Sequence, residues 1–545
     1  MHNKQVPSWL FIYGPPGSGK STLGRRLAEK LRLPFFDLDE MIEIQAGVTI
    51  PEIFDSEGET GFRQRESAAL LNLLDQPFQS LPRQGIVALG GGALLREENR
   101  ERVETEGPVF CLNAPFEALL SRLETNGNPR PLLDGNARDT LHYLLEQREA
   151  HYASFSRRLD SSLYSPEETA WHVQVQAGMF RVSGMGKEYD VRVATDGLNY
   201  LGQALKIRGM KGPVVLVSDE KVAFHYEDRV LHALQDAGYQ TRSKIISAGE
   251  RSKTIETLSV LWQAFHEASL ERYSTVIALG GGVVSDLAGF AAATYMRGVP
   301  WVVAPTSLLG MVDASLGGKT GADLPQGKNL VGSFHPPSLV LADPGVLSTL
   351  PEVELRNGLA EVVKHGIIDD PFLLDLLSTL QLNDPNPDNQ GWVLLHEKLD
   401  EIVRRAMAVK IGIIQADPYD REQRASLNLG HTLGHALEHV SGYQLRHGEA
   451  VAIGMVASAR LAESKGLAEY GLTGYIAQVL KGLGLPTEIP ANLDRVELLE
   501  AMESDKKRAN GKAQLVLPLC IGRVKWGMEV EDLSTLIAES SQPEV

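Results

Sequence analysis

A nine-residue run near the N-terminus has the composition of a phosphate-binding loop. Residues 14–22 read Gly-Pro-Pro-Gly-Ser-Gly-Lys-Ser-Thr, which fits G-x-x-x-x-G-K-[ST] between a predicted strand at 9–13 and a predicted helix at 23–33. Glycines let backbone N–H groups turn toward phosphates, Lys20 reaches the terminal phosphates and Ser21 can hold Mg²⁺. The expected nucleotide contacts are Gly17, Ser18, Gly19, Lys20, Ser21 and Thr22.

Residues that could select a phosphate acceptor follow along the same stretch of chain. Asp37 and Asp39 come after the apolar pair at 35–36, and strand alternation puts both carboxylates on one face. One carboxylate, Asp37, could serve Mg²⁺, and Asp39 could orient an accepting hydroxyl. Further candidates are Arg63, Gly90, Gly91, Gly92, Arg130 and Arg148. A single arginine on a helix is usually solvated or ion-paired, so each of these is a weak signal alone.

The second half of the chain holds three residues that could bind zinc. Glu361, His431 and His447 lie in stretches that predict helices, and two histidines with one glutamate form a recurring catalytic zinc site with an open position. Two other interpretations stay open. His431, His435 and His439 fall on one helical face, so they could form a simpler metal pair or a solvated polar stripe. A zincin protease is disfavoured, because Thr432 stands where its general base would be.

A glycine-rich run at 279–289 follows a predicted strand and opens a predicted helix, which suits a dinucleotide pyrophosphate. The run is not G-x-G-x-x-G, and a tight strand–helix turn without a ligand is an equally good interpretation of the run alone. Asp219 ends a strand where it could meet a ribose. The loop 249–253 carries both charges, and Thr306, Ser307 and Lys319 lie on later loops.

These residues need α/β elements to position them. Residues 1–160 alternate apolar runs with amphipathic helices, which predicts a parallel sheet covered by helices. Weak periodicity then predicts a linker at 161–187, in which 171–175 could form a strand. A second α/β domain is expected at 188–345 and a mainly helical domain at 346–545, with strand-like runs at 513–519 and 523–526.

Composition narrows the class of protein. The chain has 545 residues and a net charge of −17, which argues against a general nucleic-acid or anionic-membrane binder. Two cysteines are too few for a disulfide framework, and no leader or spanning segment is expected. We therefore expect a multidomain cytoplasmic protein.

The first 160 residues resemble shikimate kinase, on the evidence of the phosphate loop, Asp37-Leu-Asp39, Phe62-Arg63-Gln-Arg-Glu66, the glycines 90–92, Arg130-Pro-Leu-Leu and Arg148 near Tyr152. The resemblance implies ATP with Mg²⁺ held through Ser21 and Asp37, and catalytic roles for Lys20 and Asp39. It also implies that Arg130 sits in a lid over ATP. The implied shikimate contacts are Asp39, Arg63, Gly90, Gly91, Gly92 and Arg148.

From about residue 189 onward the chain resembles 3-dehydroquinate synthase, through the runs at 285–298, 305–309, 312–320 and 327–329. The resemblance implies zinc (or cobalt) on Glu361, His431 and His447, with Lys319, Lys364 and His435 taking part in the chemistry. The implied NAD contacts are Asp219, Gly249, Glu250, Lys253, Gly281, Gly282, Val283, Val284, Ser285, Asp286, Thr306, Ser307, Asp313, Lys319 and Lys328. The implied contacts with the substrate, the seven-carbon keto-acid phosphate DAHP, are Arg297, Lys319, Asn329, Lys364, Lys410, Arg424, Asn428 and His435.

The two resemblances together imply a bifunctional enzyme of chorismate biosynthesis. One half would phosphorylate shikimate, and the other would convert DAHP to 3-dehydroquinate and phosphate with NAD regenerated in each turnover. The rivals are another small-molecule P-loop kinase, such as a gluconate or nucleotide kinase, and a polyol dehydrogenase that uses NAD and a metal. A non-catalytic scaffold is a third alternative, which the intact motifs disfavour. A homodimer through the synthase part is a further expectation.

Overall fold

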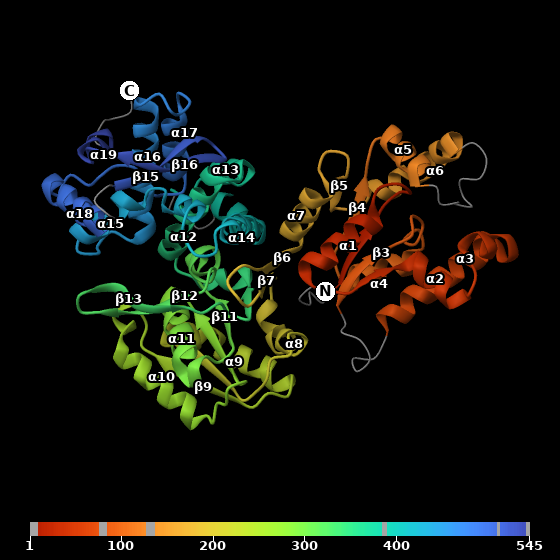
Figure 1. Ribbon diagram of the computed structural model, residues 1–545, viewed down its shortest axis with the longest axis horizontal. Coiled ribbons are helices and arrows are strands. Elements are labelled where there is room, and N and C mark those ends of the chain that lie inside the picture. Colours follow the sequence, from red (N-terminus) through yellow and green to blue (C-terminus); the bar gives the residue numbers. More distant parts are fainter. Residues whose placement is uncertain (1–8, 76–83, 127–136, 384–389, 509–512, 541–545) are drawn as a thin grey trace. The chain divides into compact units, whose positions relative to one another are not determined.

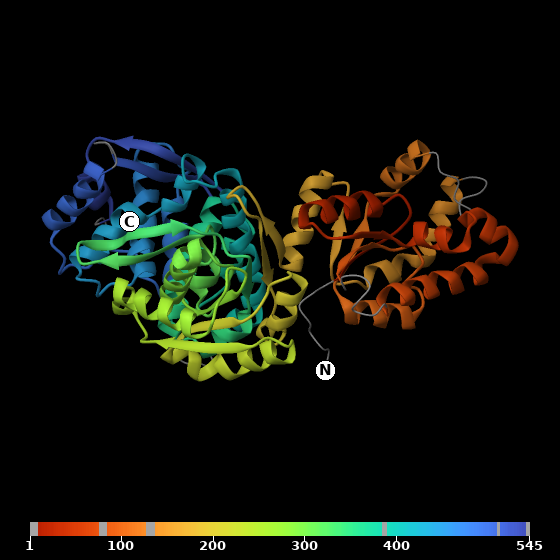
Figure 2. The same ribbon diagram turned by 60° about the horizontal axis from the view of Figure 1, so that its bottom comes forward.

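The computed structural model describes residues 9–75, 84–126, 137–383, 390–508 and 513–540, and the chain divides into two compact units, Met1–Arg181 and Val182–Val545. Figures 1 and 2 show the elements of each unit. Arg130 lies outside the described residues. Among the helices in these ranges, none combines the length and the apolar character needed to cross a membrane.

The first unit is built on a parallel sheet with the order β2-β3-β1-β4-β5. Its strands are β1 Trp9–Tyr13, β2 Phe35–Asp37, β3 Gly85–Ala88, β4 Val109–Asn113 and β5 Arg158–Asp160. Its helices are α1 Lys20–Leu31, α2 Leu38–Ala46, α3 Ile50–Leu74, α4 Glu97–Glu106, α5 Phe116–Asn126, α6 Ala137–Ala153 and α7 Pro166–Ala177.

Alternation along β1 divides the core of this unit into two layers. Trp9, Phe11 and Tyr13 pack into one apolar cluster, whereas Leu10 and Ile12 pack into another on the opposite face. Helices cover both faces, as a parallel sheet requires. Because the strands are parallel, β1, β2 and β3 deliver the phosphate loop, Asp37 and the glycines 90–92 to the same edge of the sheet.

The predicted linker at 161–187 is wrong, and so is the strand suggested at 171–175. Helix α7 occupies this stretch. Ser165 begins the helix with a capping box in which its hydroxyl accepts from the Glu168 N–H at 3.2 Å, and Pro166 follows. Ala170, Val173 and Ala177 recur at helical spacing and are buried in the cluster that contains Leu27 of α1. Helix α7 therefore belongs to the first unit.

The second unit contains a sheet that, within the described residues, has the order β6-β7-β14-β11-β10-β8-β9, and β6 includes the boundary between the units at Arg181 and Val182. Its strands are β6 Met179–Val182, β7 Tyr189–Val193, β8 Val214–Asp219, β9 Thr241–Ile246, β10 Thr275–Gly280, β11 Trp301–Pro305 and β14 Leu339–Ala342. The pairings from β7 to β9 are parallel. An antiparallel hairpin joins β12 Lys319–Leu324 to β13 Gly327–Phe334. The associated helices are α8 Leu201–Ile207, α9 Glu220–Asp236, α10 Ile255–Glu267 and α11 Gly282–Thr294.

The remainder of the second unit is mainly helical, as predicted. Its helices are α12 Glu352–Ile368, α13 Pro371–Ser378, α14 Gln390–Ala416, α15 His431–Val440, α16 His447–Ser464, α17 Leu472–Gly482, α18 Arg495–Arg508 and α19 Ser534–Ser540. The expected late strands are the hairpin of β15 Ala513–Cys520 and β16 Arg523–Val530. Most of α12 from Leu355 to Ile368 is buried, so its polar residues lie inside the protein. The predicted α/β fold class with a helical C-terminal part is confirmed.

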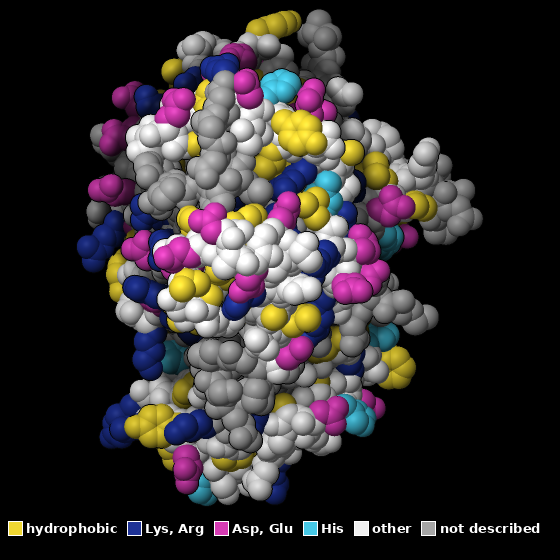
Figure 3. Space-filling model, turned by 90° about the vertical axis from the view of Figure 1, so that its right-hand side faces the viewer, with side chains coloured by type: hydrophobic (Ala, Val, Ile, Leu, Met, Phe, Trp, Pro, Cys, Tyr) yellow, Lys and Arg dark blue, Asp and Glu magenta, His cyan; other side chains and the backbone are white. Residues whose placement is uncertain are grey.

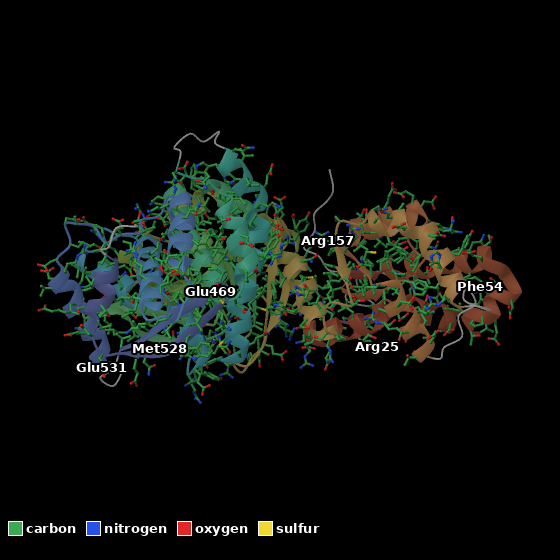
Figure 4. The ribbon with its side chains drawn as sticks, turned by 90° about the horizontal axis from the view of Figure 1, so that it is seen from above. Arg25, Phe54, Arg157, Glu469, Met528 and Glu531 are labelled. Carbon is green, nitrogen blue, oxygen red and sulfur yellow. The ribbon has the colours of Figure 1, made fainter. Side chains whose placement is uncertain are left out.

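The surface agrees with the acidic composition. On the face shown in Figure 3, lysine and arginine side chains are interspersed with aspartate and glutamate. Several surface arginines are ion-paired: Arg25, labelled in Figure 4, pairs with Glu40 of the neighbouring helix. A mixed surface of this kind requires each anionic ligand to be met by a local basic pocket.

The packing of α7 makes a stability prediction. A fragment of residues 1–178 keeps this helix, whereas a fragment of residues 1–160 loses three buried apolar side chains and uncovers Leu27. We expect the shorter fragment to be less stable by on the order of 3 kcal/mol, measured as the free energy of unfolding in urea. Equal unfolding midpoints for the two fragments would contradict the assignment of α7 to this unit.

Candidate functional sites

The phosphate loop has the backbone geometry that its sequence predicts. Gly14 has φ 133°, and a Cβ there would lie 2.2 Å from the Leu112 carbonyl oxygen, so only glycine fits. Gly19 precedes α1 with φ 91°, and no side chain caps the helix. The Lys20 ammonium donates to the carbonyls of Gly14 and Pro15, each at 3.0 Å, which holds it across the loop. The N-terminus of α1 is thus presented to an anion.

Asp37 ties the loop to the next strand. The Ser21 hydroxyl donates to Asp37 at 2.6 Å, and the second oxygen of Asp37 accepts from the Asp39 N–H at 3.1 Å. Ser21 and Asp37 therefore stand together, where a hydroxyl and a carboxylate could share one Mg²⁺. A cavity of about 520 Å³ opens beside them. Its lining includes residues 16–23, Asp39, Gly91, Arg122, Ser161, Tyr164 and Pro166.

The predicted acceptor residues gather around the glycines 90–92. Arg63 donates to Glu66 at 2.7 Å and to Glu59 at 3.3 Å. Arg148 and Tyr152 both donate to the Gly91 carbonyl, at 3.2 and 2.7 Å. A Cβ on Gly92 would lie 2.4 Å from the Arg63 guanidinium. Two arginines and a close-approaching backbone form a pocket suited to a small carboxylate.

Glu66 lies beside these residues, and the sequence analysis named it within the run 62–66 without giving it a role. Its side chain is 1% exposed, and one carboxylate oxygen has no hydrogen-bond partner among the described residues. Burial raises the pKa of Glu66, although the Arg63 guanidinium opposes the rise. Its role in the structure is to hold the Arg63 guanidinium in place.

A carboxylate and two imidazoles meet in the second unit. Glu361 on α12 lies 3.7 Å from Nε2 of His431, which begins α15, and 3.4 Å from Nε2 of His447, which begins α16. One ligand atom from each of the three lies within 4.8 Å of the others. Glu361 is fully buried, and apart from its ion pair with Lys364 neither carboxylate oxygen has a hydrogen-bond partner among the described residues. A buried carboxylate that faces two imidazoles fits a divalent cation such as zinc.

Buried cations surround this trio. Lys364, one helical turn after Glu361, forms an ion pair with it, and Lys410 of α14 pairs with Asp313. Burial alone would raise the pKa of Glu361, but Lys364 and the two histidines hold it well below its usual value. Burial likewise opposes ionisation of Asp313, but Lys410 outweighs it and lowers the pKa. Both carboxylates are therefore charged.

His365 lies beside these pairs. It forms a second cluster with Asp313 and Glu361, and neither of its ring nitrogens has a hydrogen-bond partner among the residues that the structure describes. Burial, with help from Lys364, lowers the pKa of His365 to about 3, so the ring is neutral. Because Asp313 is already paired with Lys410, the trio of Glu361, His431 and His447 is the better candidate metal site of the two.

The glycine-rich run begins α11 at the edge of the sheet. Gly281 precedes the helix without a side-chain cap, and the Ser307 hydroxyl accepts from Gly310 beside it. Lys253, almost fully buried, pairs with Asp286 at 2.6 Å and donates to Asn329 at the same distance. The structure thus joins the loop 249–253, α11 and the β12–β13 hairpin. One carboxylate oxygen of Asp219 caps α9 by accepting from two backbone N–H groups.

The other predicted substrate residues have distinct surroundings. Lys319 pairs with Asp420 at 2.6 Å, and the Arg424 guanidinium donates to the Pro418 carbonyl at 2.9 Å. His435 lies next to the metal trio, with ring centroids 5.3 Å from His431 and 6.4 Å from His447. Asn428 is exposed just before α15. Arg297 is exposed after α11 with a left-handed φ of 66°.

Comparisons with known proteins connect these sites to two families. Residues 16–176 match the family model of shikimate kinase, 243–357 that of the 3-dehydroquinate synthase N-terminal region, and 358–508 that of its C-terminal region. A 3-dehydroquinate synthase of Synechocystis is 42% identical over 348 residues, which cover 63% of this chain and 94% of the relative. The chain belongs to the 3-dehydroquinate synthase family. Its first unit is a shikimate kinase domain fused ahead of the synthase.

Further relatives agree with the synthase assignment. A 3-dehydroquinate synthase of Desulforamulus reducens is 40% identical over 360 residues, covering 66% of this chain and 98% of the relative. The structure of ValA, a 2-epi-5-epi-valiolone synthase of Streptomyces hygroscopicus with NAD⁺ and Zn²⁺ bound, is 30% identical. That match covers 66% of this chain and 98% of ValA with a TM-score of 0.58. A 2-deoxy-scyllo-inosose synthase with NAD⁺ and Co²⁺, 22% identical with a TM-score of 0.57, shares the fold.

The structure also adds residues that sequence reasoning missed. In the shikimate kinase domain these are Arg122 and Tyr164. Arg122 donates twice to Ser161, each time at 2.9 Å, and both residues line the cavity beside the phosphate loop. In the synthase, Glu438 contacts His447. Glu438 follows His431 by seven residues, which is two helical turns, so its spacing was a usable signal.

The crowding at Gly92 makes a prediction about shikimate binding. Gly92 has no left-handed φ, so alanine is conformationally allowed, but its Cβ would displace the Arg63 guanidinium. We expect Gly92→Ala to raise KM for shikimate roughly 10- to 100-fold, the effect of losing a charge-assisted hydrogen bond. KM for ATP and the melting temperature serve as internal controls. An unchanged KM for shikimate would show that Arg63 does not contribute to shikimate binding.

Proposed function

We propose that the chain performs its two activities, shikimate kinase and 3-dehydroquinate synthase, at two separate sites with one in each unit. The first transfers a phosphoryl group from ATP to shikimate. The second converts DAHP to 3-dehydroquinate and phosphate. The observation that carries the synthase site is the fully buried Glu361, which faces the imidazoles of His431 and His447 within metal-binding distance.

In the kinase, the residues act by alignment and charge neutralisation, which is what phosphoryl transfer chiefly demands. The loop N–H groups and Lys20 bind the phosphates of ATP, and Ser21 with Asp37 holds the Mg²⁺ that accompanies them. Arg63 and Arg148 pair with the shikimate carboxylate, while Gly90, Gly91 and Gly92 admit its ring. Asp39, which lines the same cavity as the phosphate loop, accepts the proton of the attacking hydroxyl.

In the synthase, Glu361, His431 and His447 hold zinc, and cobalt would suit the same donors. When bound, zinc supplies Lewis acidity toward the substrate's oxygens and NAD supplies a reversible hydride acceptor. The chain contributes binding and charge. The glycine run at the start of α11 with Asp219, the loop 249–253 and Ser307 binds the dinucleotide. Lys364 and Lys410 place two ammonium groups beside the trio, where they offset developing negative charge.

Substrate anions are bound by the remaining basic and polar groups. DAHP carries a phosphate and a carboxylate. Because the protein as a whole has a net charge of −17, the substrate site itself must supply a local excess of lysine and arginine. The proposed contacts are Arg297, Lys319, Asn329, Lys364, Lys410, Arg424, Asn428 and His435. His435 is exposed next to both zinc histidines and can hold or move a proton at the substrate.

The family matches decide against the rival activities. A polyol dehydrogenase would consume NAD in proportion to product, and a gluconate or nucleotide kinase would not match the shikimate kinase family over 16–176. Zinc and NAD in the related ValA structure support the cofactors proposed for this chain.

The deciding experiment measures phosphate release from DAHP by the full chain. We expect release to need only catalytic amounts of NAD, to stop on removal of metal by a chelator and to return with added zinc. NADH should not accumulate, because the hydride returns to the substrate skeleton in each turnover. Stoichiometric NADH formation would instead assign a dehydrogenase.

Reciprocal variants test the independence of the two sites. We expect Lys20→Ala to abolish shikimate-dependent ADP formation while phosphate release from DAHP stays within about twofold of wild type, and Glu361→Gln to do the reverse. The melting temperature of each variant is the folding control, because the activity that a variant retains reports only on the unit without the substitution. Loss of both activities in either variant would contradict two independent sites.

A further inference from the structure

Both histidines of the metal trio have their second ring nitrogen engaged. Each presents Nε2 to Glu361. His431 has Nδ1 3.2 Å from the carbonyl oxygen of Leu429, and His447 has Nδ1 3.4 Å from a carboxylate oxygen of Glu438. A carbonyl or carboxylate oxygen only accepts, so each Nδ1 donates to its partner, and Nε2 is the ring nitrogen that faces Glu361 and would bind the metal of the proposed site.

Glu438 reaches His447 because α15 and α16 pack side by side (Figure 1). It lies two helical turns after His431, on the same face of α15. Its side chain is only 14% exposed, so the carboxylate is aimed into the protein rather than at solvent. The imidazole of His447 is the one ion-pair partner found for Glu438 in the described part of the chain.

We propose that Glu438 is a positioning residue for the zinc site, holding His447 in the tautomer and ring orientation that point Nε2 at the metal. The inference rests on the zinc site proposed above. The two histidines differ in how they are held. A backbone carbonyl fixes His431 and no side-chain change removes it, whereas His447 depends on a side chain. The orientation of His447 is therefore the part of the site that a single substitution can release.

The expected consequence is a loss of metal affinity. Without an acceptor at Nδ1, His447 can adopt the other tautomer or rotate, and zinc must then organise the ring on binding. Removing such a partner of a zinc-ligating histidine typically costs 10- to 100-fold in metal affinity. The effect is specific to the oxygen acceptor, so glutamine, which retains a carbonyl oxygen, should restore part of it.

The test measures the zinc dissociation constant of the full chain by competition with a chromophoric chelator. Three variants are compared with wild type: Glu438→Ala, Glu438→Gln and His439→Ala. His439 is the matched control, because it is the next residue on the same helix, is also a potential ligand and is exposed. The melting temperature is recorded with chelator and with excess zinc, and it reports whether the second unit of each variant is folded.

We expect Glu438→Ala to weaken zinc binding at least tenfold, Glu438→Gln to weaken it less, and His439→Ala to leave it unchanged. The chelated proteins should melt together, with only the zinc-induced rise reduced in Glu438→Ala. Zinc affinity within about twofold of wild type for Glu438→Ala would overturn the inference, as would an equal loss in glutamine or a lower melting temperature of the chelated alanine variant. Failure of wild type to bind zinc would sink the proposed zinc site instead.

Discussion

The second unit depends on one buried charge. Glu361 lies on α12 and its side chain is fully buried, and burying an isolated carboxylate would cost several kcal/mol of desolvation free energy. Its charge persists because Lys364, His431 and His447 stand around it, drawn from three helices. Each of those helices must be packed before the carboxylate has its partners. The packing of α12 against the first turns of α15 and α16 therefore has two effects: it gives the buried carboxylate its partners, and it brings the proposed metal ligands together.

The site of the first unit is built in a different way. Its site is assembled at the edge of a parallel sheet, where strand ends and helix starts present backbone N–H groups and short polar side chains. Charge is handled locally, through Ser21 with Asp37 and Arg63 with Glu66. Glycines decide how closely the backbone approaches, since a Cβ at position 14 would meet the Leu112 carbonyl and one at position 92 would meet Arg63. The two sites thus need different things from the fold, which is consistent with their lying in separate units.

An acidic protein binds anionic substrates here through basic residues that are already held in ion pairs. In the described structure most basic residues proposed for DAHP already have a partner: Lys364 has Glu361, Lys410 has Asp313 and Lys319 has Asp420. Such pairs keep the side chains oriented in a site that must later accept a phosphate and a carboxylate. Substrate binding then exchanges one set of ion pairs for another, which costs less desolvation than burying a free ammonium.

Much of this protein follows from local sequence. The phosphate loop, the strand that precedes it, the glycine run before α11 and the helical character of the last third all arise from residues close together in the chain. The resemblance to two families named the expected ligands, and Glu361, His431 and His447 do meet. The error at 161–187 has a local cause too, because the Ser165 capping box and the spacing of Ala170, Val173 and Ala177 were present in the sequence but read as a linker.

Only the tertiary structure decided which long-range partners complete each site. The choice between a His431–His435–His439 stripe and a trio with Glu361 rests on where α12 and α16 pack, which no spacing along α15 specifies. The same holds for Lys253 bridging Asp286 and Asn329, for Glu66 behind Arg63 and for Glu438 behind His447. A motif is written in neighbouring residues, and so the sequence alone determined the phosphate loop and the candidate metal ligands. The partners that hold those ligands come from other helices. A buried charged group is cut off from water, so its stability depends on the polar side chains that neighbouring helices and strands place beside it.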